Sequence, residues 1–115
     1  MAANDAMAVL TIAAASGDEQ AVAAWLDEGG DVDARCTEPN GETLLLAAAA
    51  RGQDAMVRML LQRGASVNLQ DSLGGTALMN AALNGHATIM QVLLDAKADA
   101  SLQAMGGHTA LMAAE

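Results

Sequence analysis

Cys36, His86 and His108 supply the thiol and imidazole groups of this sequence, which could act as nucleophiles, general bases or metal ligands. A thiolate beside an imidazole can serve nucleophilic catalysis, and both groups are common ligands of zinc. The three residues stand far apart in the sequence, and none belongs to a CxxC or HxxxH pair. The sequence therefore predicts no catalytic set and no metal site, and no cofactor is expected.

Carboxylates are concentrated in one part of the chain. Eight of the 14 acidic side chains fall within 25 residues: Asp18, Glu19, Asp27, Glu28, Asp31, Asp33, Glu38 and Glu42. A solvated acidic surface that keeps this part of the protein soluble is the first interpretation. The alternative is a docking patch for a basic partner, which would make association depend on salt.

Length, charge and hydropathy restrict the class of protein. The chain has 115 residues, the length of one domain, and a formal net charge of -9 that opposes binding to nucleic acid and anionic lipid. The longest apolar run, residues 44–50, is too short to span a bilayer, and residues 1–15 lack the layout of a signal peptide. Because Cys36 is the single cysteine, we expect an intracellular, cytoplasmic protein.

The sequence repeats itself with a step of 33 residues, which indicates one structural unit stacked several times. Residues 43–70 match residues 76–103, and the step continues to Gly107 and Thr109. Upstream the step is 35 residues, which places an insertion near residues 36–39. The informative matches are Gly41 with Gly74, Thr43 with Thr76, Leu45 with Leu78, Gly52 with Gly85, Leu60 with Leu93, and Gly17, Trp25, Leu26 and Asp33 with Gly52, Leu60, Leu61 and Asn68.

Each repeat predicts two short helices separated by a glycine and followed by an extended segment. We expect Gly64 to end its helix in the left-handed conformation, and Lys97 stands at the matched position of the next unit. A non-glycine residue there costs about 1 kcal/mol, so this helix end is expected to be softer. The expected helices cover residues 4–15, 18–28, 43–50, 54–62, 76–83 and 87–96, and a fourth unit begins at residue 104.

The units resemble the ankyrin repeat, through TLLLAA at residues 43–48, TALMNA at 76–81, TALMAA at 109–114 and GASVN at 64–68. The resemblance implies an all-α solenoid of stacked helix-turn-helix units with β-turn tips. It implies a single domain over residues 1–115, with units at about 4–36, 37–70 and 71–103 and a partial unit at 104–115. The proline of the family signature is replaced by Leu44, Ala77 and Ala110, and its histidine by Leu46, Met79 and Met112.

Two side-chain roles follow from this resemblance. Thr43, Thr76 and Thr109 are retained, and their hydroxyls can satisfy free backbone donors at a helix start. His86 follows Gly85 where the family commonly has a structural Gly-His, so we expect it to bond to neighbouring loop backbone rather than to act as a base.

The resemblance also implies a non-catalytic protein-binding or scaffold module. In ankyrin arrays the partner is usually a protein, held by the turn tips and the inner face of the first helices. An apolar strip beside polar residues suits an interface, although scattered surface apolar residues are also normal. The matching residues here are Pro39, Asn40, Glu42, Ala50, Arg51, Ser72, Leu73, Gly75, Leu83, Asn84, Met105 and His108.

The partial fourth unit presents Leu111 and Met112 with no second helix to cover them. Three explanations stay open: the chain pairs with a second copy through this edge, a partner protein completes the stack, or the sequence belongs to a longer array. Self-pairing would most simply give a two-fold homodimer. Homo-oligomeric assembly through this edge is therefore the alternative function.

Overall fold

Six α-helices make up the described part of the chain, which comprises residues 3–35, 41–102 and 107 of a computed structural model. They are α1 (Ala3–Ser16), α2 (Glu19–Asp27), α3 (Leu44–Ala50), α4 (Asp54–Gln62), α5 (Ala77–Leu83) and α6 (Ala87–Asp95). The six predicted helices are confirmed, each to within about one residue at its ends. The predicted partial helix after residue 104 lies outside the described residues.

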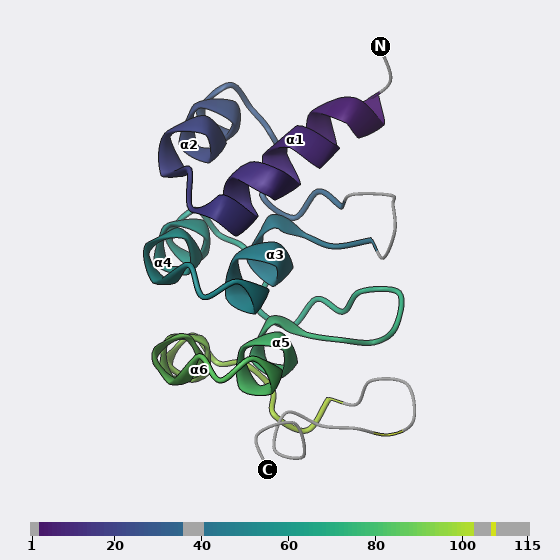
Figure 1. Cartoon of the computed structure of the whole chain (residues 1–115), viewed down its shortest axis with the longest axis vertical. Coiled ribbons are helices and arrows are strands. Elements are labelled where there is room, and N and C mark those ends of the chain that lie inside the picture. Colours follow the sequence, from purple (N-terminus) through teal and green to yellow (C-terminus); the bar gives the residue numbers. More distant parts are fainter. Residues whose placement is uncertain (1–2, 36–40, 103–106, 108–115) are drawn as a thin grey trace.

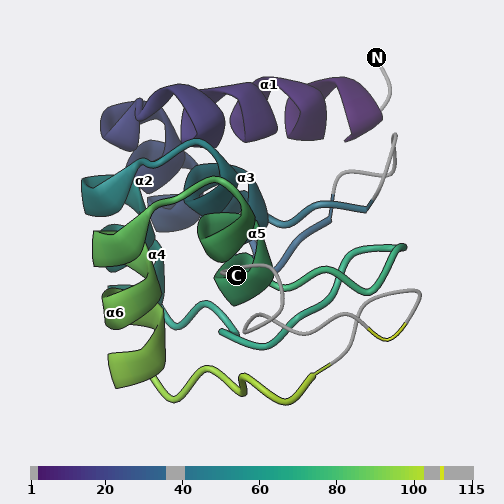
Figure 2. The same ribbon diagram turned by 60° about the horizontal axis from the view of Figure 1, so that its bottom comes forward.

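The helices form two rows, an inner row of α1, α3 and α5 and an outer row of α2, α4 and α6 (Figure 1). Within each row, neighbours pack side by side, and the two helices of each of the three hairpins also contact one another. The segments that join the hairpins project from the side of the inner row (Figure 2). The predicted all-α stack of helix-turn-helix units is confirmed. We call the side made by the inner row and the described residues of these segments, including the turn at residues 71–75, the inner face.

Small aliphatic side chains fill the core between the rows. In α3, the middle helix of the inner row, residues 44–49 are all buried. Alanines in this helix allow neighbouring helices to approach closely, and leucines fill the remaining space at the density typical of protein interiors. Leu46 and Met79, which replace the histidine of the repeat signature, are both buried, so apolar packing does hold these positions together.

Two buried threonines begin the inner helices α3 and α5. The hydroxyl oxygens of Thr43 and Thr76 accept hydrogen bonds from the backbone N–H groups of Leu46 and Met79, each at 3.2 Å. This confirms their predicted capping role. Helix α1 has Ala8 at the matched position and continues upstream to Ala3. Because alanine favours helix and cannot cap one, α1 has 14 residues where α3 and α5 have seven.

The ends of the inner helices α1 and α3 are each completed by a side chain of the next hairpin. Gln53 Nε2 donates to the carbonyl oxygen of Ala15 at 2.9 Å, and His86 Nε2 lies 3.3 Å from that of Ala50. The predicted structural role of His86 is thereby confirmed. A Cβ on Gly52 would come within 2.8 Å of the His86 ring, so glycine is required there for this close approach as well as for its φ of 75°.

The end of α6 carries the backbone conformation expected from the sequence. Lys97 has a φ of 74°, at the position where the preceding hairpin has Gly64 with a φ of 91°. Among the described residues it is the one non-glycine residue with positive φ. The positive φ expected at Lys97 is therefore confirmed, and the softer end of α6 stays a prediction.

The segments beyond the outer helices are also joined from unit to unit. Asp33 accepts hydrogen bonds from the amide and hydroxyl of Ser66, at 2.8 and 2.6 Å, and Asn68 Oδ1 accepts from the amide of Asp99 at 2.7 Å. The hydroxyl and amide of Ser101 donate to Asp99 and hold the pKa of that carboxyl below its ordinary value. A hydrogen bond between neighbouring units thus recurs with the repeat, as does the fold within each unit.

Candidate functional site

Eight of the twelve residues predicted to bind a protein partner lie in the described part of the chain, and all of these lie on the inner face. They are Glu42, Ala50, Arg51, Ser72, Leu73, Gly75, Leu83 and Asn84. Pro39, Asn40, Met105 and His108 lie outside the described residues, as do Leu111 and Met112, which were predicted to support self-association. The structure therefore gives the positions of the residues in the middle of the predicted surface.

Leu83 and Asn84 end the inner helix α5 and face solvent. The Leu83 side chain is 72% exposed. Asn84 Nδ2 donates to the carbonyl oxygen of Asn80 at 2.9 Å, which keeps the amide against its own helix. This region therefore presents a large apolar side chain next to a fixed polar one.

Leu73 lies in a tight turn that Asp71 organises. The carboxylate oxygen Oδ1 of Asp71 accepts hydrogen bonds from the amides of Leu73 and Gly75, at 2.9 and 2.8 Å. An aspartate that bonds the backbone two residues on is a common device for stabilising turns. The turn leaves Leu73 53% exposed and its neighbour Ser72 exposed as well.

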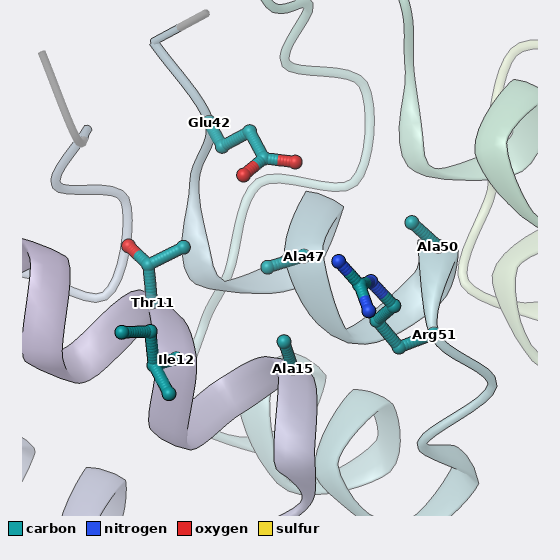
Figure 3. Close-up of a pocket in the computed structure, with 7 residues that line it drawn as sticks. All are labelled: Thr11, Ile12, Ala15, Glu42, Ala47, Ala50 and Arg51. Carbon is teal, nitrogen blue, oxygen red and sulfur yellow. The ribbon is translucent and has the colours of Figure 1, made fainter. Parts of the chain in front are cut away.

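A hollow of about 220 Å³ opens on the inner face between α1 and α3, and we call it the α1–α3 hollow (Figure 3). In the close-up, Thr11 and Ile12 of α1 lie on one side, Ala50 and Arg51 of α3 lie on the other, and Ala15 and Ala47 lie between them. Glu42 reaches toward it from the segment that precedes α3. Three residues of the predicted surface, Glu42, Ala50 and Arg51, thus come together around a depression lined partly by alanines.

The repeat explains why the depression is in this place. Ala47 and Ala50 correspond, 33 residues later, to Asn80 and Leu83. The larger side chains occupy the matched positions on α5, whereas α3 presents only methyl groups there. At these two positions α3 therefore lines the hollow with methyl groups, whereas α5 carries larger side chains.

Sequence analysis missed the contribution of α1 to this surface: Thr11, Ile12 and Ala15. The signal was present, since the step of 35 residues matches Ile12 with Ala47 and Ala15 with Ala50. Ile12 lines the hollow and is 66% exposed. The inner face thus continues over α1, beyond the limits predicted for it.

Two charges of opposite sign border the α1–α3 hollow. Among the residues that the structure describes, neither the Glu42 carboxylate nor the Arg51 guanidinium makes a side-chain hydrogen bond or ion pair, with each other or with a third group. By contrast, Arg63 of the outer row pairs with Asp27 at 2.6 Å. Glu42 and Arg51 are therefore available to a partner.

Several residues of the acidic cluster have structural roles. Asp18 caps α2 by accepting from the amide of Ala21, Asp27 pairs with Arg63, and Asp31 accepts from the amide of Asp33. Asp33 in turn bonds Ser66 of the next unit. Glu38 lies outside the described residues. The cluster therefore holds turns and unit contacts together, whether or not it also binds a partner.

The residues that could act as nucleophiles, general bases or metal ligands are not brought together in the described ranges. His86 is engaged with Ala50, and Cys36 and His108 lie outside those ranges. Within residues 3–35, 41–102 and 107, no group of three or more His, Cys, Asp or Glu side chains could hold a metal ion. In the same part of the chain, no helix is both long and apolar enough to cross a membrane.

Comparison with protein families agrees with this geometry. The family model described as ankyrin repeats, in three copies, matches residues 10–104 and also residues 63–115. Ankyrin repeats are generally protein–protein interaction modules, and proteins built from them are typically non-catalytic. The stacked hairpins, the capping threonines and the family match agree, and the chain belongs to the ankyrin-repeat family.

Proposed function

We propose that this chain is a non-catalytic protein-binding or scaffold module that holds its partner on the inner face. The distribution of exposed apolar side chains carries this proposal. Among the described residues, five large apolar side chains are strongly exposed: Val9, Ile12, Leu73, Leu83 and Leu94. Four of the five lie on the inner row or on the turn beside it. Large apolar side chains with polar neighbours are typical of protein interfaces.

The proposed surface combines the described residues with those predicted from the sequence. It comprises Glu42, Arg51, Ser72, Leu73, Leu83 and Asn84, together with Pro39, Asn40, Met105 and His108. We further propose one domain over residues 1–115 with units at about 4–36, 37–70, 71–103 and 104–115. A cytoplasmic location is supported by the single cysteine, Cys36.

Aspartate substitutions on the inner face test the proposal. Binders are first selected with the immobilised chain from a display library of protein fragments. Their affinities are then compared for the unchanged chain, Leu83→Asp, Leu73→Asp and the outer-row control Leu94→Asp. Loss of an apolar contact together with burial of a charge should weaken binding by about tenfold or more for the first two variants and leave the control unchanged.

Circular dichroism of each variant shows whether the helices persist. Equal affinity for all four chains, with intact helices, would place binding elsewhere and remove the inner face as the site. A larger loss for Leu94→Asp than for Leu83→Asp would assign binding to the outer row.

Self-association is a second candidate, and the exposure of Val9 and Ile12 on α1 is the observation that favours it. At the positions that match Val9 in the next units, Leu44 and Ala77 are buried, and their helices pack against the preceding inner helix. Sedimentation across a wide concentration range tests this candidate directly. A dimer that Val9→Asp disrupts would support it, and a monomer throughout would exclude it.

A further inference from the structure

We propose that the α1–α3 hollow takes one large aliphatic side chain of an extended protein segment, whose flanking residues pair with Arg51 through a carboxylate and with Glu42 through a cation. This inference rests on the proposed function and names the chemistry of the partner. Its occupant is neither a free small molecule nor a second copy of the chain.

The lining of the hollow suits an aliphatic side chain. Its floor consists of the methyl groups of Ala15, Ala47 and Ala50, and Ile12 forms an apolar side wall. Its volume is about 220 Å³. A cavity of about 150 Å³ lined by apolar side chains suffices to bind benzene in another protein, so this hollow has room for a leucine, isoleucine or methionine side chain.

The border of the hollow supplies the selectivity. Glu42 and Arg51 border the apolar floor and, within the described ranges, have no charged partner of their own. An anchor residue alone would satisfy neither group. A segment that places an acidic residue and a basic residue on either side of its anchor complements both charges, and partly desolvated pairs of this kind fix register and orientation.

Net charge argues against a second copy as the occupant. Each chain carries a formal charge of -9, so two copies repel one another at long range. The same charge attracts segments that are basic overall. We therefore expect the bound segment to have a positive net charge, with an acidic residue only beside the anchor.

The chain itself offers a matched variant that places a larger side chain in the lining of the hollow. Ala50→Leu introduces the residue that α5 carries at the corresponding position, Leu83, and this side chain is accommodated there by the same fold. Ile12→Ala, on the exposed side of α1, removes the wall without filling the floor. Leu94→Asp on the outer row is the control. Circular dichroism checks that all variants remain helical.

The test uses a display library of short random peptides selected against the full chain. We expect enriched peptides to share a leucine, isoleucine or methionine between an acidic and a basic residue. Their affinity should fall by about tenfold or more with Ala50→Leu, fall less with Ile12→Ala, and stay unchanged with Leu94→Asp. Arg51→Glu should weaken binding, and a peptide with lysine in place of its acidic residue should restore it.

Three results would overturn the inference. Peptides that bind Ala50→Leu and the unchanged chain equally, but lose affinity for Leu83→Asp, would leave the proposed function standing and place the anchor elsewhere on the inner face. A library that yields no such peptides would show that the hollow does not take a short segment. A dimer of the chain alone that Ala50→Leu dissociates would assign the hollow to a second copy.

Discussion

Helices α1 and α3 occupy the same place in consecutive units, and their surroundings differ. Leu44 of α3 is fully buried, whereas Val9, at the matched position of α1, is 66% exposed. Helix α3 packs between α1 and α5, and α1 packs only against α3 within its row. The side chains at this position are therefore buried by the neighbouring unit, as expected for stacked repeats.

The largest expected effect comes from shortening the same position in both helices. Leu44→Ala should lower the free energy of unfolding by about 2 to 5 kcal/mol, because it leaves a cavity between α3 and its neighbours. Val9→Ala should change it by no more than about 0.5 kcal/mol, because the side chain is already mostly in water. Denaturant unfolding followed by circular dichroism measures both. Equal losses would show that α1 is covered in solution.

The threonine cap of α3 should contribute less to the free energy of unfolding than the buried Leu44 side chain. Thr43→Ala should cost about 1 kcal/mol, because the amide of Leu46 loses its acceptor at a buried helix start. Thr43→Ser keeps the hydroxyl and serves as the control in the same unfolding experiment. If the serine and alanine variants were equally unstable, the methyl group rather than the cap would account for the loss.

Exchange of the two helix-end residues tests the third unit against the second. Lys97→Gly should stabilise the protein by about 1 kcal/mol, and Gly64→Lys should destabilise it by about the same amount, because a side chain is disfavoured at positive φ. Thermal and denaturant unfolding report both changes. A Lys97→Gly variant that is less stable than the unchanged chain would mean that the lysine side chain contributes more than its backbone strain costs.

The ion pair between the first two outer helices should contribute least. Arg63 and Asp27 are both well exposed, so their coupling in a double-mutant cycle with alanine should be below about 1 kcal/mol. The coupling should shrink further as salt is added. A salt-insensitive coupling of several kcal/mol would show that the first unit is held mainly by its charges.

Local sequence signals were sufficient to predict the helices. Gly17, Gly52 and Gly85 mark the turn within each hairpin and all have positive φ, and the threonines mark two helix starts. Such signals act over a few residues, so they can be read without knowledge of the neighbours. Lys97 could be located for the same reason.

The α1–α3 hollow could not be predicted in this way, because its shape depends on side chains from two units that face one space. In a chain so rich in alanine, a match between two alanines is weak evidence, although Ala15, Ala47 and Ala50 line the depression. The pairing of Arg63 with Asp27 is a similar case, since it joins long side chains 36 residues apart. Which charges stay unpaired follows only from the assembled structure.

The bond from Gln53 to the carbonyl oxygen of Ala15 also affects the timing of folding during synthesis. The two residues are 38 positions apart, so the end of α1 lacks its donor until the second hairpin has been made. At typical rates of translation this interval is on the order of seconds. During it, Leu10 and Ala14, which pack in the common core of the finished protein, also wait for α3. The newly made first hairpin therefore exposes aliphatic side chains until the second hairpin is complete.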